Sequence, residues 1–578
     1  MNRIDFADPP LRRRFGPARA VLAAHRLQEV RPVLDAAEAA ARAGAWVLGY
    51  LRYEAAPAFD TAFVAHAPDG PLAWFAVHDE MEAPVPEPVD APWHLTPAAG
   101  LERAAFDAAL GRIQQAIGAG AVYQVNLTAP WHGRLEGSAD ALFAALRRAQ
   151  PGGYAAHLDC GGGARVLSVS PELFFDWRAG PDGAGRILTR PMKGTATRGV
   201  TPGADARQAE ALRASAKERA ENVMIVDLLR NDLSRIAAPH SVRVPRLFHT
   251  EALPTVWQMT SDVEARTRPG TRLADVFGAL FPCGSVTGAP KVQAMRLIRE
   301  LENGPRGVYC GAVGLVRPDG AGGIAATFNV PIRTLELNGD AVRCGIGSGI
   351  VWGASAQAEW EEWAAKRAFV VRASAPFDLL ETLALVDGVF RHRAKHLARL
   401  AGAAAHFGVP WQAAEVEACL DALAGAHPQG AWRVRLLLGA RGLPRAEAFA
   451  LLPTQEPVRL RLADRPFPEA HSEFTRHKTT RRAHYAAFAP QEGAFDTVLY
   501  NEAGEITEST FGNLALHIDG EWLTPPLECG LLPGVGRAVA LREGRVREGV
   551  VRVADLPRVR EWAFINSLRG WLAAELLD

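Results

Sequence analysis

The sequence pattern changes near residue 375, and this change constrains how the chain can fold. Between residues 101 and 366, stretches typical of helices and of strands alternate without an obvious break. Residues 377–385 then read as a strand, and 392–407 have the amphipathic pattern of a helix that begins a new unit. A length of 578 residues corresponds to roughly three to four domain-sized units, too much for one core. The sequence therefore predicts two large parts, residues 1–375 and 376–578.

The first part divides further. Residues up to about 95 form an N-terminal subregion, and its proline-rich stretch 83–92 predicts an extended connector rather than a helix or strand. The catalytic core is expected over residues 101–370. Within this core the pattern predicts one long helical region from about 205 to 236.

Composition argues against several classes of protein. Lys+Arg and Asp+Glu are equal at 64 each, so no overall field favours nucleic acid or an anionic membrane. No apolar run approaches the roughly 20 residues that span a bilayer, and the first ten residues lack the apolar core of a secretion signal. The six cysteines form no Cys-x-x-Cys pair, so neither structural zinc nor a disulfide framework is expected. We expect a cytoplasmic protein with no nucleic-acid or membrane partner.

Two acidic helices and a glycine-rich strand predict a metal site. Glu359, Glu362 and Lys366 are spaced so that one helix face carries all three. This spacing is also typical of a solvated charged face, but here it follows the glycine-rich stretch 345–351, which suits close approach of a ligand to the backbone. Glu221 borders an apolar run on a second helix, and an acid beside a buried face needs a partner. A Mg²⁺ ion shared by Glu221 and the other two glutamates would supply one.

The glycine-rich loop 284–291 predicts an anion site. It precedes a helix that begins near Val292, and the N-terminus of a helix favours an anion. The loop lacks the Gly-Lys-Ser/Thr of a Walker A motif, so nucleotide binding is not expected.

Over almost its full length, the first part resembles the chorismate-using enzymes. The resembling segments are 170–174, 191–195, 221–232, 281–291, 306–311, 331–334 and 345–366. The resemblance implies an α+β or α/β fold of mixed β-sheets with surrounding helices, and Mg²⁺ ligation by Glu221 and Glu362, with Glu359 as a third candidate. The implied substrate contacts are Thr287, Tyr309, Arg333, Gly347, Ser348, Gly349 and Lys366. Arg333 suits this task because a guanidinium group can hold a carboxylate with two hydrogen bonds.

Within this family, the residue at position 193 separates two reactions. It is lysine in aminodeoxychorismate synthases and normally alanine in anthranilate synthases, and here it is Lys193. By resemblance, Glu172 protonates the C4 hydroxyl of chorismate, which requires a protonated carboxyl near neutral pH. Lys193, as a neutral amine, then attacks C2.

Two glutamines also bear on the reaction. Gln124 stands where isochorismate- and salicylate-forming relatives carry a water-activating lysine, so a hydroxyl nucleophile is disfavoured. Gln258 stands where many relatives have a histidine that, in anthranilate synthases, is linked to pyruvate elimination. Its absence agrees with a product that keeps its pyruvyl group.

From residue 377 onward the chain resembles fold-type IV pyridoxal phosphate enzymes, specifically aminodeoxychorismate lyase. Lys478 is the candidate Schiff-base lysine, and Glu508 resembles the glutamate that keeps the pyridine nitrogen protonated. Arg399 would bind the cofactor phosphate together with the backbone of Val535 and Gly536. Because threonine is common at position 536 in this fold, one hydroxyl contact is expected to be missing.

The rest of this second site is less defined. Tyr485 is a candidate for contact with the cofactor's ring oxygen, with a packing role as an equal alternative. Asn566, Ser567 and Arg569 resemble the substrate-side segment of the lyase. The part also lacks the N-terminal hairpin with which most such enzymes begin, which leaves the completeness of its small lobe open.

Together the two parts predict an enzyme of folate biosynthesis that converts chorismate to 4-aminobenzoate in two steps. No cysteine lies in the Gly-x-Cys-x-Gly setting of a glutaminase nucleophile, so either a separate glutamine amidotransferase subunit or free ammonia is expected. Fold-type IV enzymes are commonly dimers, which makes a homodimer through the second part an open expectation. The alternatives are an anthranilate synthase fused to an aminotransferase of the branched-chain or D-amino-acid type, and a catalytically inactive scaffold.

Overall fold

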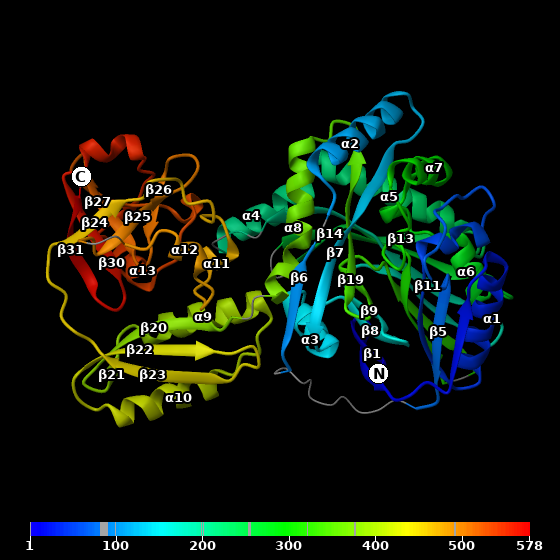
Figure 1. Ribbon diagram of the computed structural model, residues 1–578, viewed down its shortest axis with the longest axis horizontal. Helices are drawn as coiled ribbons and strands as arrows, with labels where there is room; N and C mark the ends of the chain where they lie inside the picture. The colour runs from blue at the N-terminus through cyan, green and yellow to red at the C-terminus, as the bar shows by residue number, and fades with distance from the viewer. Residues whose placement is uncertain are drawn as a thin grey trace. The chain divides into compact units, whose positions relative to one another are not determined.

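The computed structural model describes residues 2–80, 91–98, 100–197, 199, 202–252, 256–320, 322–374, 377–490 and 493–577. The chain forms two compact units, Met1–Ser374 and Ala375–Asp578 (Figure 1). The proline-rich connector predicted at 83–92 lies outside the described residues as far as residue 90. Within the described part of the chain, no helix combines the length and the apolar character needed to cross a membrane.

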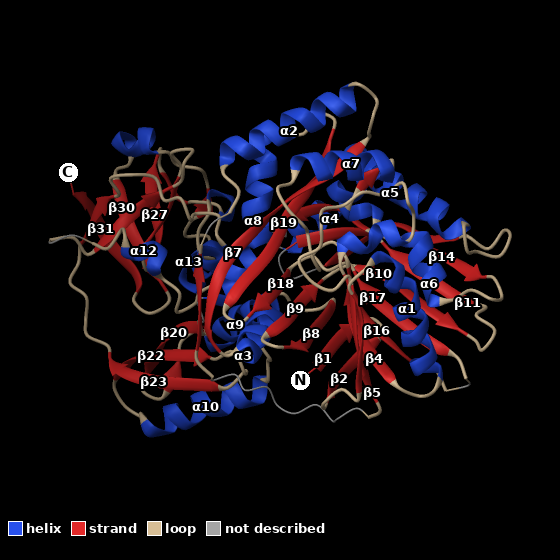
Figure 2. Ribbon diagram, turned by 45° about the vertical axis from the view of Figure 1, so that its right-hand side comes forward, coloured by secondary structure: helices blue, strands red, loops and turns tan. Residues whose placement is uncertain are grey.

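The first unit contains two large antiparallel sheets (Figure 2). The first sheet has the order β15 (Gly288–Ala289), β7 (Gln124–Gly137), β19 (Ala341–Val351), β18 (Thr334–Asn338), β9 (Ala164–Ser170), β8 (Tyr154–Gly161), β1 (Asn2–Ala7) and β2 (Pro10–Phe15), with β6 (Trp93–Pro97) paired to β7. The second has the order β12 (Met192–Thr197), β14 (Val256–Thr267), β11 (Gly185–Arg190), β10 (Leu173–Ala179), β17 (Ile324–Asn329), β16 (Ala312–Pro318), β4 (Trp46–Leu51), β5 (Ala73–His78) and β3 (Ala20–Ala24), with β13 (Arg243–Ala252) paired to β14.

Helices cover both sheets, and apolar side chains fill the space beneath them. On the first sheet, Phe106, Ile298 and Trp363 come from the covering helices and pack with Leu127 and Ile350 of the strands. The helices near this sheet are α2 (Arg103–Gly118), α3 (Ala139–Ala149), α7 (Lys291–Leu301) and α8 (Ala356–Ser374). The helices that pack on the second sheet are α1 (Leu27–Arg42), α4 (Pro202–Ala214), α5 (Ala216–Ser234) and α6 (Leu273–Leu280).

The long helical region predicted from about 205 to 236 is present, but it is divided into two helices. The structure has α4 and α5 with a break at Ser215, which is extended and whose hydroxyl accepts a hydrogen bond from the backbone N–H of Glu218. Serine at this position caps the new helix by pairing one of its free N–H groups. The break lets the two helices run in different directions, and Glu221 lies in the second turn of α5.

The second unit has a small and a larger sheet. The smaller, antiparallel sheet has the order β21 (Val389–Phe390), β20 (Leu379–Val386), β22 (Ala431–Leu438) and β23 (Pro444–Ala450), and packs with α9 (Arg393–Phe407) and α10 (Ala413–Ala426). The larger, mixed sheet has the order β26 (Ile506–Ser509), β25 (Asp496–Tyr500), β24 (Val458–Leu462), β31 (Gly570–Leu577), β30 (Glu561–Asn566), β27 (Asn513–Ile518), β28 (Glu521–Thr524) and β29 (Arg547–Glu548). Short helices α11 (Glu473–Arg476), α12 (Ala483–Ala486) and α13 (Val535–Arg542) connect the strands. The predicted strand at 377–385 and helix at 392–407 are thus confirmed within two residues.

Two candidate active sites

The first candidate site forms where β12 meets the paired strands β7 and β19. Residues 347 and 349 pair with Thr128 and Asn126, and residue 351 pairs with Gln124. A side chain added at Gly349 would place its Cβ 2.8 Å from both Lys193 Nζ and Gln124 Nε2. The glycine therefore leaves the space that the lysine ammonium and the glutamine amide use.

Lys193 is held by its backbone as well as by its side chain. Its Nζ lies 3.3 Å from Glu221 Oε2. The amide of Gln258 donates to the carbonyl of Gly194 at 2.9 Å, and the amide of Asn222 approaches the carbonyl of Lys193 at 3.5 Å. Gln258, at the position where many relatives have histidine, thus supports the turn that presents Lys193.

Glu172 is a buried carboxyl with one polar partner from the anion loop. It lies between β9 and β10 and accepts a hydrogen bond from Ser285 Oγ at 2.7 Å. Burial raises the pKa of Glu172 to about 7, against the hydrogen bond from Ser285 and the charge of Lys193, which both lower it. A carboxyl with this pKa is well suited to donate a proton near neutral pH.

Four glutamates from α5 and α8 lie in the region of Lys193 and Lys366. Lys366 Nζ is 2.6 Å from Glu362 and donates to the carbonyl of Gly347 at 2.9 Å, while the Ser348 hydroxyl donates to Glu359. Glu218 is a fourth acid that sequence reasoning missed, and burial followed by the charge of Glu221 raises its pKa. Among the described residues, no three metal-binding side chains lie close enough together to hold an ion.

Arg333 and Thr287, two predicted substrate contacts, differ in the partners that their side chains already have. The guanidinium of Arg333 donates to the amide oxygen of Gln150, and no carboxylate of the described residues pairs with it. Burial and then the charge of Arg372 lower the pKa of Arg333 to about 10, so an anion beside it would be stabilised. The Thr287 hydroxyl donates instead to the carbonyl of Cys283 at 2.8 Å, which shapes the loop.

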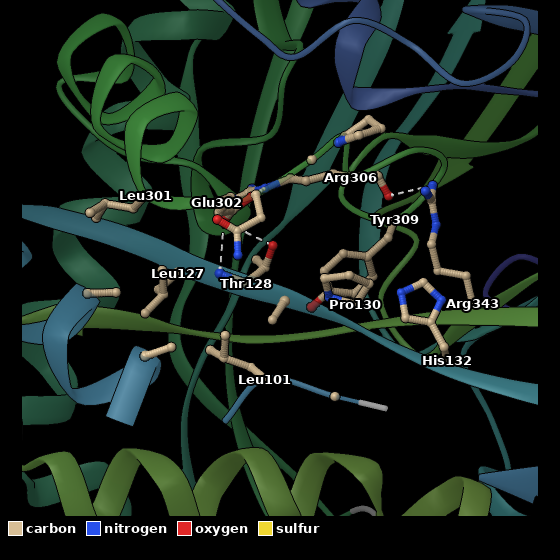
Figure 3. Close-up of a pocket in the computed structure, with 18 residues that line it drawn as sticks. Leu101, Leu127, Thr128, Pro130, His132, Leu301, Glu302, Arg306, Tyr309 and Arg343 are labelled. Carbon is tan, nitrogen blue, oxygen red and sulfur yellow. Dashed lines mark hydrogen bonds and ion pairs between the residues drawn. The ribbon is translucent and has the colours of Figure 1, made fainter. Parts of the chain in front are cut away.

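A cavity of about 300 Å³ opens beside this site without containing its reactive groups (Figure 3). The cavity lies along β7, between the residues that pair with β15 (124 and 125) and those that pair with β6 (133–137). Thr128 and Tyr309 are among its lining residues. The Tyr309 ring lies against Gly345, but neither Lys193 nor Glu172 lines the cavity. Tyr309 and Gly345 thus line the cavity together, and the reactive side chains lie outside it.

Gln124 is the least satisfied polar side chain in this region. It is fully buried, and neither atom of its amide has a hydrogen-bond partner among the described residues. A buried amide without partners is costly, so the arrangement points to a polar group that Gln124 meets when substrate is present.

The glycine at position 349 gives a first prediction. In Gly349→Ala the new methyl group contacts Lys193 and Gln124, so the first reaction is expected to slow about 10²-fold, as a displacement of about 1 Å does in catalytic sites. The measurement is the rate of chorismate consumption with ammonium. Gly111→Ala on α2 is the control, since a methyl group there meets nothing within 4 Å. An unchanged rate in Gly349→Ala would contradict the assigned position of Lys193.

The second candidate site centres on Lys478, whose side chain is partly buried in the second unit. Burial, followed by the charges of Arg482 and Arg399, lowers the pKa of Lys478 to about 7. An amine with this pKa is largely neutral just above neutral pH, which is the form that attacks a carbonyl carbon.

Glu508 faces the same region. It is almost fully buried and accepts hydrogen bonds from the Tyr485 hydroxyl at 2.7 Å and from the backbone N–H of Leu532 at 3.1 Å. Burial raises the pKa of Glu508 to about 7, against these two hydrogen bonds. Tyr485 therefore supports Glu508 directly, a contact that the sequence did not indicate.

A buried cluster at the other end of this site joins Arg399 to Ser567. Glu381 accepts from Arg399 Nε at 2.8 Å and from its terminal nitrogen at 2.7 Å, and contacts His396 Nδ1 at 2.6 Å. His396 Nε2 lies 2.5 Å from Ser567 Oγ. Sequence reasoning named Arg399 and Ser567 but missed Glu381 and His396, although both lie in apolar-patterned segments where a buried acid and a buried imidazole need partners.

The remaining residues of the second site lie close to this cluster. A side chain at Gly536 would place its Cβ 2.7 Å from the carbonyl carbon of Asn566. Glycine at this position, where threonine is common, thus allows the start of α13 to approach the 566–567 backbone. Asn566 Oδ1 accepts from the N–H of Arg569 at 2.8 Å, and Arg569 Nε donates to Thr454 at 2.8 Å. Val535 is the first residue of α13.

Comparison with known proteins decides the family. Residues 80–372, half of the chain, match the family model described as chorismate binding enzyme. The chain belongs to the chorismate-binding enzyme family. This chorismate-binding enzyme also matches the amino-transferase class IV model over residues 378–576. The predicted fold class, a chorismate-using fold followed by a fold-type IV domain, is confirmed.

Relatives of this chorismate-binding enzyme carry two different activities in their names. It is 39% identical over 277 residues to aminodeoxychorismate synthase component 1 of Salmonella typhimurium, covering 48% of this chain and 59% of that protein. It is 38% identical over 265 residues to anthranilate synthase component 1 of Streptomyces coelicolor, covering 46% and 50%. The chain thus spans less than two thirds of either relative, and overall identity does not separate the two activities.

Among solved structures, the chain is similar to the putative 2,3-dihydroxybenzoate-specific isochorismate synthase DhbC of Bacillus anthracis. The TM-score is 0.51 at 19% identity, covering 64% of this chain and 95% of that one. At this identity the likeness concerns the fold, and it agrees with the two-sheet architecture of the first unit.

Proposed function

We propose that the protein makes 4-aminobenzoate from chorismate in two consecutive reactions. The first unit aminates chorismate at C4 to give 4-amino-4-deoxychorismate, and the second eliminates pyruvate from that product. The observation that carries the proposal is Lys193, whose amine lies beside the glycine strand and Gln124, within the electrostatic reach of the buried Glu172. An alanine at this position, as in anthranilate synthases, would leave no nucleophile there.

The first reaction needs an acid, a nucleophile and a grip on the substrate. Glu172 donates its proton to the C4 hydroxyl, which leaves as water while Lys193 Nζ forms a bond to C2. Ammonia then attacks C4, and the bond between C2 and Lys193 breaks. Arg333, a buried guanidinium with no carboxylate partner among the described residues, would bind a carboxylate of chorismate.

The acids of α5 and α8 have the chemistry of a Mg²⁺ site. Three carboxylates from two helices, Glu221, Glu359 and Glu362, influence the same lysines, and oxygen ligands of this kind suit Mg²⁺. We assign Glu221 and Glu362 as the residues that would hold the ion, with Glu359 as a third. When bound, the ion would supply positive charge for the carboxylates of chorismate.

The second unit has the side chains that fit pyridoxal phosphate. Lys478 is the amine that would bind it, Glu508 would pair with the pyridine nitrogen, and Arg399 would meet the phosphate. The cofactor supplies an electron sink next to the carbon that carries the substrate amine. Lys478 would take the proton from C4, and the bond between C3 and oxygen would break. The three-carbon arm would leave as enolpyruvate, which takes up a proton at its methylene carbon and becomes pyruvate.

Neither site has residues that would generate the ammonia used in the first reaction. We propose a separate glutamine amidotransferase subunit or free ammonia as its source, and a homodimer through the second unit remains part of the proposal. No cysteine of the sequence has the flanking glycines of a glutaminase nucleophile, which supports an external source.

Product analysis tests the proposed function. The purified chain is incubated with chorismate, ammonium, Mg²⁺ and pyridoxal phosphate, and 4-aminobenzoate with pyruvate is the expected result. Leaving out pyridoxal phosphate should let aminodeoxychorismate accumulate. Anthranilate as the product would replace the proposal by the rival, an anthranilate synthase fused to an aminotransferase, and no conversion at all would favour the scaffold.

The contribution of Glu172 to the rate of the first reaction should fall as the pH rises above about 7. Because the pKa of Glu172 is raised to about 7, its acid form is present below that pH and is lost above it. The ratio of the wild-type rate to the rate of Glu172→Gln removes every ionisation that the two enzymes share. With the concentration of neutral ammonia held constant, we expect this ratio to be about 10²–10⁴ and level below pH 7, and to fall about tenfold per pH unit above it. A full rate in Glu172→Gln would assign the acid to another group.

A further inference from the structure

The cluster of Arg399, Glu381, His396 and Ser567 has a fixed order of donors and acceptors. Although burial raises its pKa, the Arg399 guanidinium and then His396 hold the pKa of Glu381 at about 2. The carboxylate is therefore ionised and can only accept hydrogen bonds. Since Arg399 donates to both of its oxygens, His396 Nδ1, at 2.6 Å, must carry a hydrogen and donate as well.

This order leaves two states for the contact between His396 and Ser567. If the imidazole is neutral, Nε2 has no hydrogen, and the Ser567 hydroxyl must donate to it across 2.5 Å. If the imidazole is protonated, Nε2 donates to Ser567 Oγ, and the single hydrogen of Ser567 is free for another acceptor. The protonation of His396 thus decides whether Ser567 offers a donor or a lone pair to the site.

An anion beside Arg399 and Ser567 favours the second state. Arg399 Nη1 donates to the carbonyl of Pro533, just before α13, so the guanidinium, the start of this helix and Ser567 come from one neighbourhood. Because Glu381 already neutralises Arg399, a doubly charged phosphate would meet too little positive charge without a further cation. A protonated His396 supplies that charge and frees the Ser567 hydrogen at the same time.

We propose that His396 is a proton-coupled positioning residue: a phosphate group binds at Arg399 and Ser567 together with one proton, which His396 takes up at Nε2. The proposal rests on the proposed cofactor site, because the phosphate group meant is that of pyridoxal phosphate. At pH 8 the phosphate arrives as a dianion, so the proton comes from the solvent. No bond to phosphorus forms or breaks, and the Ser567 hydrogen only changes its acceptor.

The charged groups around His396 come from several elements. Glu381 lies on β20, Lys395 and Arg399 lie on α9, and His392 lies just before α9. Lys478 lies near Glu381 and Arg399. Arg542 and Glu543, at the end of α13, lie near His392. Of these, only Glu381 contacts the imidazole directly, and its charge is constant over the pH range of a test.

The test measures proton uptake on binding to the full chain freed of cofactor. Pyridoxal phosphate and pyridoxal, which lacks the phosphate, are titrated calorimetrically at pH 8 in two buffers of different ionisation enthalpy. The difference between the two ligands isolates the phosphate from the chemistry at Lys478. We expect about one more proton taken up with the phosphate, and a phosphate-dependent affinity that falls about tenfold per pH unit above pH 8.

Variants separate coupling from a structural role. His396→Gln and Ser567→Ala should lose both the extra proton and the pH slope. His392→Gln, which changes an exposed histidine just before the same helix, should keep them. If His396→Gln does not fold, Ser567→Ala alone decides, because it leaves the imidazole in place. Weaker binding with an unchanged pH slope in these variants would overturn the proposal and leave a packing role.

Inorganic phosphate distinguishes this inference from the proposed function. If the chain binds inorganic phosphate with proton uptake but does not bind pyridoxal phosphate, the cofactor assignment fails. The anion site at Arg399 and Ser567 would then be a site for inorganic phosphate. If pyridoxal phosphate binds without phosphate-dependent proton uptake, the cofactor assignment stands and the role of His396 falls. If wild-type chain binds neither, both are overturned.

Discussion

Lys193→Ala is expected to abolish the amination of chorismate while leaving the second reaction intact. The substitution removes the amine that lies beside Gly349 and Gln124, so the attack on C2 has no nucleophile. Loss of a covalent nucleophile leaves only binding and electrostatic effects, and we expect a decrease of at least about 10³-fold. The measurement is chorismate consumption and aminodeoxychorismate formation by chromatography, with added aminodeoxychorismate still converted to 4-aminobenzoate.

A lysine on the same carboxylate provides the matched control. Lys217 lies 4.0 Å from Glu221 on its other oxygen and is largely exposed. Lys217→Ala removes the same charge from the neighbourhood of Glu221 but no nucleophile, and should keep most of the amination rate. If Lys217→Ala and Lys193→Ala were equally slow, the effect would be electrostatic, and the covalent role of Lys193 would be rejected.

Lys478→Ala is expected to have the opposite pattern. Amination continues, aminodeoxychorismate accumulates, and pyruvate release falls by at least about 10³-fold, because the amine that takes the C4 proton is removed. One readout is pyruvate, measured by a coupled assay. The other is the visible absorbance of bound pyridoxal phosphate, which should not appear when the cofactor is added to the variant.

Lys395, which precedes His396 on α9, is the control for the second unit. Lys395→Ala should retain both pyruvate release and the absorbance of the cofactor. Normal pyruvate release by Lys478→Ala would show that the elimination takes place elsewhere or without this lysine, and the second half of the proposed function would then fail.

Local patterns in the sequence predicted much of what positions the two sites. The alternation of glycines over 345–351 indicated a strand that a ligand approaches closely, and Gly349 does leave the space beside Lys193. The amphipathic period over 392–407 predicted α9. Both predictions depend on periodicity within one segment, which the sequence displays directly.

Other features were wrong or missed because they depend on contacts between distant segments. The break between α4 and α5 required Ser215 to be read as a cap within an otherwise helical pattern. The hydrogen bond from Ser285 to Glu172 joins residues 113 positions apart, and that between His396 and Ser567 joins residues 171 apart. No local pattern indicates such pairs, so the role of Glu172 as an acid was expected only by resemblance.

The sequence by itself determined the division into two parts, the family resemblances and the identity of the residue types at each candidate position, because these are properties of segments. The tertiary structure alone decided the state of those residues. Burial raised the pKa of Glu172 and lowered that of Lys478, each to about 7. It left the Gln124 amide without partners and placed His396 between Glu381 and Ser567. The physical reason is that the free energy of a charge or a hydrogen bond depends on all the groups that exclude water around it, and folding brings these together from far along the chain.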